Sequence, residues 1–412
     1  MPSLQATAAA VRAGELDPVD LVEQALQRAT GAARLNAVVH LDVEGARATA
    51  AAHSRAGALA GIPVLVKEII EVEGLPYRCG SASMDGPATK DADVVRRLRA
   101  AGAVIIGLSH SHEFAYGCTG TSNRIGPCLN PHDLSRMTGG SSSGAGAAVA
   151  AGVVPLAIGT DTAGSVRTPA ALCGVVGYKP ANATLPTDGV FPLSQSLDTV
   201  GVLAGTVTDA VYAMDALSGQ RTAAAVGTPR LGVPGNPEYR GYDAKVSAAW
   251  EQAMARLQTV EVELPDWTTT LQTGVDLQGP EAVANHMGRS TELYQPDVQQ
   301  RLREAAEVPA WRYVQAQATA RDLTRQLSEV LDQVDAVVLP TVPIVAPLLD
   351  AADVRANLMR HVRLANIAGV PAISIPLDTA GLPVGLQVIA QSNQLAGAVA
   401  GWIAGRLDLN PA

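Results

Sequence analysis

Apolar segments of two lengths alternate along the first third of the chain. Residues 3–13 and 17–30 carry apolar side chains at helical spacing, and Asp17 followed by Pro18 is typical of a helix start, since aspartate caps a first turn that tolerates proline. Short apolar runs predict strands over 35–41, 62–67 and 103–108, with helices over 43–54 and 91–101 between them. This alternation predicts an α/β fold.

A charge-free run of small residues lies near the middle of the sequence, between two turns rich in Gly, Ser and Thr. The first turn spans 139–144 and the second spans 160–165. Between them, 145–151 has too many small residues for an exterior amphipathic helix, and 153–158 resembles a strand that is buried on both faces. We expect a turn, a buried helix, a buried strand and a second turn, with both turns near an edge of the sheet.

The remaining sequence predicts the rest of one continuous domain over 1–412. A helix is expected over 206–216, a strand over 231–233 and a mostly helical region with few motifs over 235–330. Apolar runs at 335–339, 373–375 and 384–389 predict strands that complete the sheet, and the chain closes with a helix over 395–406. No repeat, low-complexity linker or Gly/Ser-rich hinge divides the sequence.

Composition narrows the classes of function. Hydrophobic residues make up 47% and charged residues 17% of the chain, which indicates a large buried core, and the 3% aromatic content means that Ala, Val and Leu must fill it. The net charge of −9 argues against non-specific nucleic-acid binding, which depends on basic surface. The longest uncharged run, 139–160, is too broken by Ser, Gly and Pro to predict a membrane span, and no secretory signal is apparent, so we expect a cytoplasmic protein.

Metal and disulfide chemistry find little support in the sequence. The four cysteines form no Cys-x-x-Cys pair, so buried free thiols are expected, although a disulfide between Cys118 and Cys128 stays open. His110 and His112 have no acidic or cysteine partner at metal-ligand spacing. We therefore expect neither a metal nor an organic cofactor.

The serine turns are candidates for nucleophilic chemistry. Backbone N–H groups in Gly-rich turns can hold a developing oxyanion, and a hydroxyl beside them can act as the nucleophile. A serine needs a base, and no histidine lies in the central stretch. Lys67 ends the apolar run 61–67, where burial would lower its pKa and leave a neutral amine able to accept a proton.

These residues together resemble the amidase signature family. Its hallmark is a Gly-Gly-Ser-Ser-Gly turn, then Gly-Thr-Asp-x-Gly-Gly-Ser-x-Arg-x-Pro-Ala and a closing Gly-x-Lys-Pro, and the matching residues here lie between 139 and 180. The resemblance implies that Ser165 is the nucleophile, that Ser141, reached through a cis peptide, relays the proton, and that Lys67 is the base. It also implies a mixed central β-sheet flanked on both faces by helices, with a signature core over 61–205, a substrate funnel over 235–330 and a sheet completed by 335–406.

The resemblance assigns further roles around this triad. The backbone N–H groups of Thr162, Ala163, Gly164 and Ser165 would form the oxyanion hole. Structural support is expected from Gly139, Gly140, Ser142, Asp161 and Arg167, and substrate contact from Glu113, Phe114 and Gly117. Asp198 is expected to cap or brace the site. The sequence departs from the family at Ser143 and Ala163, where Gly is commoner; a positive φ at position 163 would make Ala cost about 1 kcal/mol.

The implied reaction is hydrolysis of a small-molecule amide, with a homodimer as the family expectation. One alternative is the glutamine-hydrolysing A subunit of a tRNA-dependent amidotransferase. Such proteins carry an acidic residue soon after the Gly-Leu-Gln strand, whereas residues 390–394 here contain none, and the chain is short for that role. A second alternative, a non-catalytic binding or scaffold protein on the same fold, is disfavoured by the intact Lys67, Ser141 and Ser165.

Overall fold

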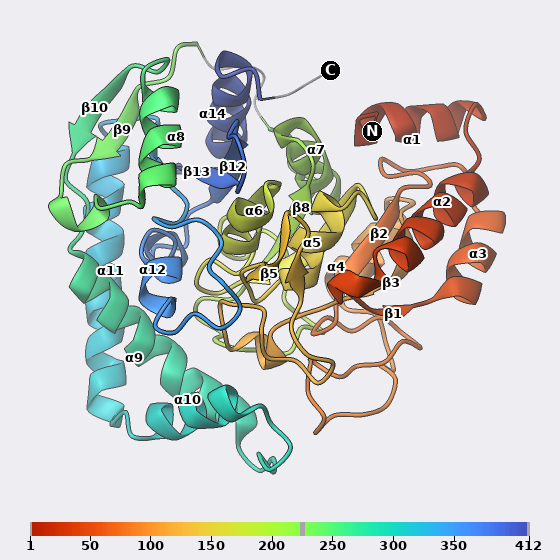
Figure 1. Ribbon diagram of the computed structural model, residues 1–412, viewed down its shortest axis with the longest axis horizontal. Helices are drawn as coiled ribbons and strands as arrows, with labels where there is room; N and C mark the ends of the chain where they lie inside the picture. The colour runs from red at the N-terminus through yellow and green to blue at the C-terminus, as the bar shows by residue number, and fades with distance from the viewer. Residues whose placement is uncertain (1, 223–226, 410–412) are drawn as a thin grey trace.

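A large mixed β-sheet forms the centre of the molecule (Figure 1). The computed structural model describes residues 2–222 and 227–409, and within them eleven strands pair into this one sheet. In spatial order the strands are β1 (Val38–Leu41), β3 (Val104–Ser109), β2 (Pro63–Lys67), β6 (Leu156–Asp161), β8 (Thr199–Ala204), β7 (Val176–Lys179), β12 (Ala372–Leu377), β13 (Val384–Ile389), β11 (Ala336–Pro340), β9 (Leu231–Pro234) and β10 (Thr259–Val262). A separate two-stranded sheet pairs β4 (Leu129–Asn130) with β5 (Asp133–Met137).

Helices cover both faces of the large sheet. They are α1 (Leu4–Ala13), α2 (Pro18–Gly31), α3 (Val43–Ala51), α4 (Asp93–Ala100), α5 (Ser143–Ala150), α6 (Arg167–Cys173), α7 (Val207–Ser218), α8 (Ala244–Met254), α9 (Trp267–His286), α10 (Pro296–Ala306), α11 (Ala310–Leu331), α12 (Arg355–Met359), α13 (Arg363–Ile367) and α14 (Asn393–Arg406), with short 3-10 turns η1 (Ala33–Leu35), η2 (Glu113–Ala115) and η3 (Pro237–Tyr239). Figure 1 shows α9, α10 and α11 reaching beyond the sheet at the lower left. This is the predicted α/β class, with the predicted mixed sheet.

The strand that ends in Lys67 divides the core between the two faces. Side chains alternate along a strand, so Val64 and Val66 join the cluster under α1, α7 and α14, whereas Leu65 joins the cluster under α2, α3 and α5. Lys67 has the same parity as Leu65 and therefore points toward the side of α5. Every residue of β2 is buried, which explains why the strand is apolar up to its last residue, Lys67.

Most predicted elements are confirmed, with shifts at their ends. Asp17 caps α2 by accepting a hydrogen bond from the backbone N–H of Val19, and Pro18 opens that helix, as predicted. The strand expected over 153–158 begins three residues later, because Pro155 precedes it, and runs on through Asp161. The expectation that both turns lie near a sheet edge is wrong: β6 is an interior strand, and the second turn lies at its carboxyl end.

Several elements were absent from the prediction. Helix α6 and strands β7 and β8 follow the second serine turn, in a segment whose residues were interpreted as motifs and not as secondary structure. Strand β10 interrupts the region that was expected to be mostly helical. The single domain over 1–412 stays a prediction, and its ends, residues 1 and 410–412, lie outside the described residues.

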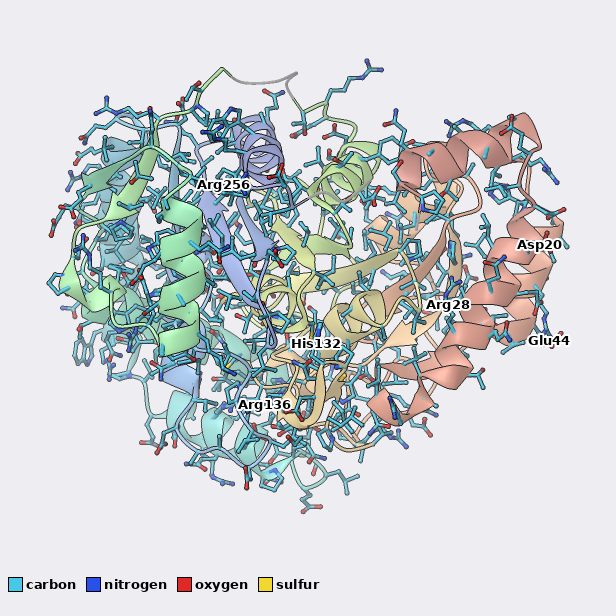
Figure 2. All side chains as sticks on the ribbon, turned by 45° about the horizontal axis from the view of Figure 1, so that its top comes forward. Asp20, Arg28, Glu44, His132, Arg136 and Arg256 are labelled. Carbon is cyan, nitrogen blue, oxygen red and sulfur yellow. The ribbon has the colours of Figure 1, made fainter. Side chains whose placement is uncertain are left out.

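Side-chain placement follows the expected division between core and surface. All four cysteines are free and buried, so Cys118 and Cys128 do not form a disulfide. Figure 2 shows charged side chains of the outer helices projecting away from the sheet, including Asp20 of α2 and Glu44 of α3. Among the helices of the described residues, none combines the length and the apolar character that crossing a membrane requires.

Candidate active site

Two adjacent parallel strands place Lys67 beside the end of the buried central strand. β2 and β6 run parallel with Val66 opposite Ile158, so Lys67, the last residue of β2, lies next to Thr160. The Nζ atom of Lys67 is 2.8 Å from Oγ1 of Thr160 and 2.7 Å from Oγ of Ser141. The residues 67 and 141, far apart in sequence, are therefore in direct contact.

Burial sets the chemistry of Lys67. The side chain is fully buried, and this desolvation lowers its pKa from 10.5 to about 7, although the carboxylates of Asp198, Asp161 and Glu68 act in the opposite direction. Near neutral pH a large fraction of this lysine is a free amine. Such an amine can accept a proton from the hydroxyl group at 2.7 Å.

The first serine turn is joined to the second one by direct hydrogen bonds. The Gly140–Ser141 peptide is cis, and the backbone N–H of Ser142 donates to the carbonyl oxygen of Ser165 over 3.1 Å. The hydroxyl of Ser142 donates to the carbonyl of Thr160 and accepts from its N–H. Ser142 thus connects the start of α5, the end of β6 and the backbone of Ser165.

A buried ion pair holds the second turn. Asp161 and Arg167 are both fully buried, and the Arg167 guanidinium donates to both carboxylate oxygens of Asp161. Burial alone would raise the pKa of Asp161, but Arg167 outweighs it and holds that pKa well below its usual range. The remaining guanidinium hydrogens bind the side chains of Asn366 and Gln387 and the carbonyl of Val362. Asp161 and Arg167 therefore fix the turn and do not face the pocket.

A second carboxylate braces the same turn from the other side. Asp198 accepts a hydrogen bond from the Thr162 hydroxyl at 2.6 Å and others from the backbone N–H groups of Leu193 and Ser194. Its burial raises its pKa to about 6.

The backbone N–H groups of the second turn differ in their availability. The N–H of Gly164 donates to Oδ1 of Asp161 at 2.8 Å, so Gly164 is removed from the predicted oxyanion hole. Within the described chain, the N–H groups of Thr162, Ala163 and Ser165 donate no hydrogen bond. Gly164 contributes in another way: its φ is +99°, and a Cβ there would collide with Val362. Ala163 is not among the residues with positive φ in the described chain, so the penalty considered for it does not arise.

Ser165 of the predicted triad lines a cavity, whereas Lys67 and Ser141 are fully buried. Ser165 is 7% exposed and lines a pocket, hereafter the inner pocket, with Ala115, Tyr116, Gly117, Cys118, Thr162, Ala163, Leu193, Gln278, Arg355 and Met359. No hydrogen bond joins the Ser165 and Ser141 hydroxyls in the described residues. The structure thus brings Lys67 into contact with Ser141, and the Ser141–Ser142 turn into contact with the Ser165 backbone.

The three expected substrate-binding residues divide between the pocket and the core. Gly117 lines the inner pocket. Phe114 is buried against Phe191 and His286, and Glu113 is fully buried and accepts a hydrogen bond from the N–H of Gln295, so neither faces the pocket. Local sequence could not separate these neighbours, because the 3-10 turn that contains Phe114 turns consecutive side chains to different sides.

Several residues at the site were not anticipated. Thr160 was part of a quoted motif, but its contact with Lys67 depends on the pairing of two strands. Gln278, Arg355 and Met359 reach the pocket from α9 and α12, and no local pattern marks them. Ser143, where the family usually has Gly, is buried, and its hydroxyl lies 2.7 Å from Nδ1 of His110, which ties α5 to the end of β3.

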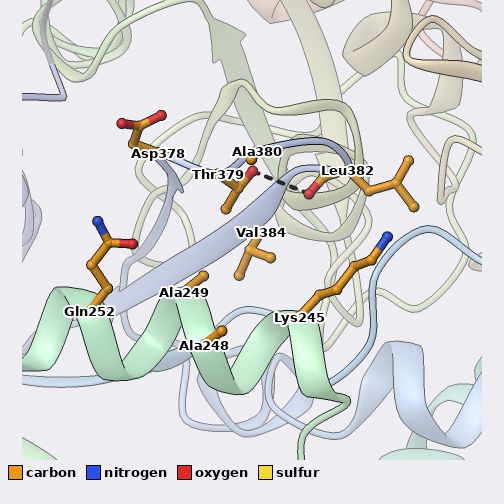
Figure 3. A pocket seen from close by; sticks show the side chains of 9 residues that line it. All are labelled: Lys245, Ala248, Ala249, Gln252, Asp378, Thr379, Ala380, Leu382 and Val384. Atoms are coloured by element: carbon orange, nitrogen blue, oxygen red, sulfur yellow. Dashed lines mark hydrogen bonds between the residues drawn. The ribbon is translucent and has the colours of Figure 1, made fainter.

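A separate cavity lies on the far part of the sheet. Figure 3 shows it between α8 and the turn that joins β12 to β13, with Lys245, Gln252 and Asp378 at its rim. Thr379, which also lines it, donates its hydroxyl hydrogen to the carbonyl oxygen of Leu382. None of the predicted site residues lines it, whereas Gly117 and Ser165 line the inner pocket.

Comparison with known proteins now settles the family. The family model described as Amidase matches residues 20–394. The chain belongs to the amidase family. This amidase-family chain is 35% identical to the A subunit of the glutamyl-tRNA(Gln) amidotransferase of Deinococcus deserti, with 98% of the chain and 97% of that protein covered. It is 36% identical to 2-amino-5-chloromuconic acid deaminase of Comamonas testosteroni, with coverage of 94% and 92%.

Solved structures agree with this assignment. A crystal structure of an amidase superposes with a TM-score of 0.93 at 32% identity, covering 98% of this chain and 100% of that one. The native peptide amidase of Stenotrophomonas maltophilia superposes with a TM-score of 0.83 at 29% identity, with coverage of 99% and 97%. The predicted family and its mixed sheet are therefore confirmed.

Proposed function

We propose that this chain hydrolyses the C–N bond of a carboxylic amide to an acid and ammonia or an amine, through an acyl-enzyme on Ser165. The observation that carries the proposal is the contact of the buried Lys67 amine, with its pKa near 7, with the Ser141 hydroxyl at 2.7 Å. Membership of the amidase family supports the same reaction class. No metal or organic cofactor is required by this chemistry.

The proton moves through the two serines. Neutral Lys67 takes the Ser141 proton while Ser141 takes the proton of Ser165, and Ser165 Oγ attacks the amide carbonyl carbon. The relay then returns the proton to the leaving nitrogen as the C–N bond breaks. Water attacks the resulting ester, with Lys67 again accepting the proton through the relay, and releases the acid together with free Ser165.

The developing oxyanion is held by backbone donors. The free N–H groups of Thr162, Ala163 and Ser165 are the candidates, with Gly164 excluded by its bond to Asp161. The Asp161–Arg167 pair fixes the turn before substrate binds, so these donors need no rearrangement during the reaction.

The test is covalent labelling followed by an activity screen. A serine-directed fluorophosphonate should add one adduct to the wild-type chain and none to Ser165→Ala, by intact-mass analysis, and wild type should release ammonia from small amides. Ser142→Ala, which keeps the proposed triad, serves as the matched control and should still be labelled. A wild-type chain without an adduct would favour a non-catalytic protein on this fold, and full activity of Ser165→Ala would disprove the assignment.

A second candidate is the glutamine-hydrolysing A subunit of an amidotransferase complex, which the similarity to the corresponding protein of D. deserti supports. The absence of an acidic residue at 390–394 weighs against it. Release of ammonia from glutamine in preference to simple amides, in the same screen, would favour this candidate.

A further inference from the structure

A second pocket with positively charged lining residues adjoins the inner pocket. This outer pocket is lined by the polar and charged side chains of Tyr116, Gln278, Arg301, Glu304 and Arg355, with small and apolar residues of α9 and α10 between them. Tyr116, Gln278 and Arg355 line both pockets, so the two pockets lie side by side and share these three residues. Arg355 stands at the junction.

Three guanidinium groups surround this junction. Arg355 has no hydrogen bond or ion pair within the described residues. Arg301 forms an ion pair with Asp297 at 3.1 Å, and the same carboxylate also accepts from His112. Arg363 is fully buried, and its Nε and Nη1 atoms have no hydrogen-bond partner in the described chain. Asp297 is therefore shared, and it cannot neutralise the other two arginines.

Arg363 lies directly behind the pocket wall. Its Nη2 donates to Oε1 of Gln278 over 3.4 Å, and Gln278 lines both pockets, so its amide nitrogen, which donates no hydrogen bond within the described residues, stays available to a ligand. Space for the guanidinium exists because position 274 of α9 is glycine, where a Cβ would collide with Arg363. Burial lowers the pKa of Arg363 to about 10, and repulsion from Arg355 acts in the same direction.

Negative charge is scarce in the same space. Among the described residues no carboxylate lines the inner pocket, and the outer pocket has only that of Glu304, which is an exposed residue. An anion beside Arg355 would therefore gain a charge-assisted bidentate contact and relieve repulsion among the arginines, whereas an ammonium group would be repelled by Arg355 and, among the described lining residues, could pair only with the exposed Glu304.

We propose that the substrate of this amidase is a monoamide of a dicarboxylic acid, whose free carboxylate binds Arg355 and the Gln278 amide while its carboxamide lies at Ser165. The inference rests on the proposed function, since it assumes that the inner pocket is where the amide is cleaved. A carboxylate fits better than a neutral chain because the lining that contains Ser165 also contains the unpartnered guanidinium of Arg355 and the amide of Gln278. Glutamine fits less well, because its α-ammonium group would find no carboxylate in the inner pocket.

The experiment compares three amides of similar size and different charge. Succinamate is anionic, butyramide is neutral and γ-aminobutyramide is cationic. The wild-type kcat/KM for ammonia release should be about ten- to a hundredfold higher for succinamate than for butyramide, the range of a charge-assisted hydrogen bond, and lowest for γ-aminobutyramide. Arg355→Gln should reduce the preference for succinamate by about tenfold or more, and Arg355→Lys should restore part of it.

Arg303→Gln is the matched control, because it removes the same charge from an exposed position on α10 outside the pocket lining. It should leave the preference unchanged. Calorimetric titration of Ser165→Ala with succinamate and butyramide then measures recognition without turnover, and succinamate should bind the more tightly.

The outcomes separate this inference from the proposed function. The carboxylate assignment is overturned if wild type hydrolyses butyramide and succinamate equally. It is also overturned if the preference of Arg355→Gln for succinamate over butyramide stays within about twofold of the wild-type preference. Either result leaves the amidase proposal standing. Succinamate could bind tightly to Ser165→Ala, lose this binding when Arg355→Gln is added, and yet release no ammonia with the wild-type protein. This combination would support the carboxylate site and contradict the proposed reaction. Equal weak binding of both amides also overturns the inference.

Discussion

Raising the pH is expected to stabilise this protein through Lys67. The lysine has an ordinary pKa of 10.5 when unfolded and one of about 7 in the folded chain, where burial disfavours the ammonium. Each pKa unit is worth about 1.4 kcal/mol, so the full difference corresponds to about 5 kcal/mol. This is the free energy by which burial favours the neutral amine.

The sign follows from proton counting. Between pH 7 and 10.5 the unfolded chain keeps a proton on this lysine that the folded chain has released. The free energy of unfolding therefore rises with pH in that window, and Lys67 alone should add about 2 kcal/mol between pH 7 and 9. Below pH 7 both states hold the proton and the contribution to the slope disappears.

Equilibrium urea denaturation of wild type and Lys67→Met at pH 7 and 9 measures this contribution. The comparison is needed because Lys179 is also fully buried with a pKa near 7 and adds a slope of its own. The difference in unfolding free energy between wild type and Lys67→Met should shift by about 2 kcal/mol in favour of wild type at pH 9. Lys179→Met, which leaves Lys67 in place, should keep the Lys67 contribution. Parallel behaviour of wild type and Lys67→Met would show that Lys67 stays charged when folded, and the proposed base would then be refuted.

Three further outcomes are expected. The rate of fluorophosphonate labelling of Ser165 should fall about tenfold for each pH unit below 7, because only neutral Lys67 accepts a proton; an unchanged rate across pH 5–7 would contradict this base. Arg167→Met leaves the fully buried Asp161 without its counter-charge and should lower the free energy of unfolding by about 3–5 kcal/mol in urea denaturation, whereas a loss below about 1 kcal/mol would show that the pair is not needed. Gly164→Ala should lower the thermal midpoint and slow the labelling, because the residue has a positive φ and its new methyl group meets Val362; unchanged labelling would mean that the turn can shift without cost to the site.

Local sequence predicted the parts of this molecule that are governed by local rules. The Asp17–Pro18 helix start, the apolar strand that ends in Lys67 and the two serine turns could be read directly, since capping, burial and turn formation depend on neighbouring residues. Strand β10 was missed because Thr259–Val262 is short and largely exposed, so it carries no hydrophobic signal. Its place in the sheet depends on pairing with β9.

The finer chemistry of the site could not be predicted in the same way. The loss of Gly164 from the oxyanion hole depends on where the Asp161 carboxylate points, and that direction is set by Arg167 and by Asn366, which lies 205 positions away. Arg355 and Gln278 come from helices that are distant in sequence and meet only when α9 and α12 pack beside the turn. Contacts of this kind leave no periodic pattern in one sequence.

The proposed catalytic groups and the residues proposed to recognise the substrate come from different secondary-structure elements, so mutation can change one property without the other. The groups proposed to move the proton come from β2, the start of α5 and the turn after β6, whereas the charged wall of the pocket comes from α9, α10 and α12. The second set lies entirely beyond residue 266 in the chain, and it meets the first where α12 packs against the second turn and at the inner pocket. A lineage could therefore exchange one substrate for another by altering those helices while it inherits the proposed base and nucleophile unchanged. A laboratory library confined to those helices would sample new specificities with the proposed reaction kept constant.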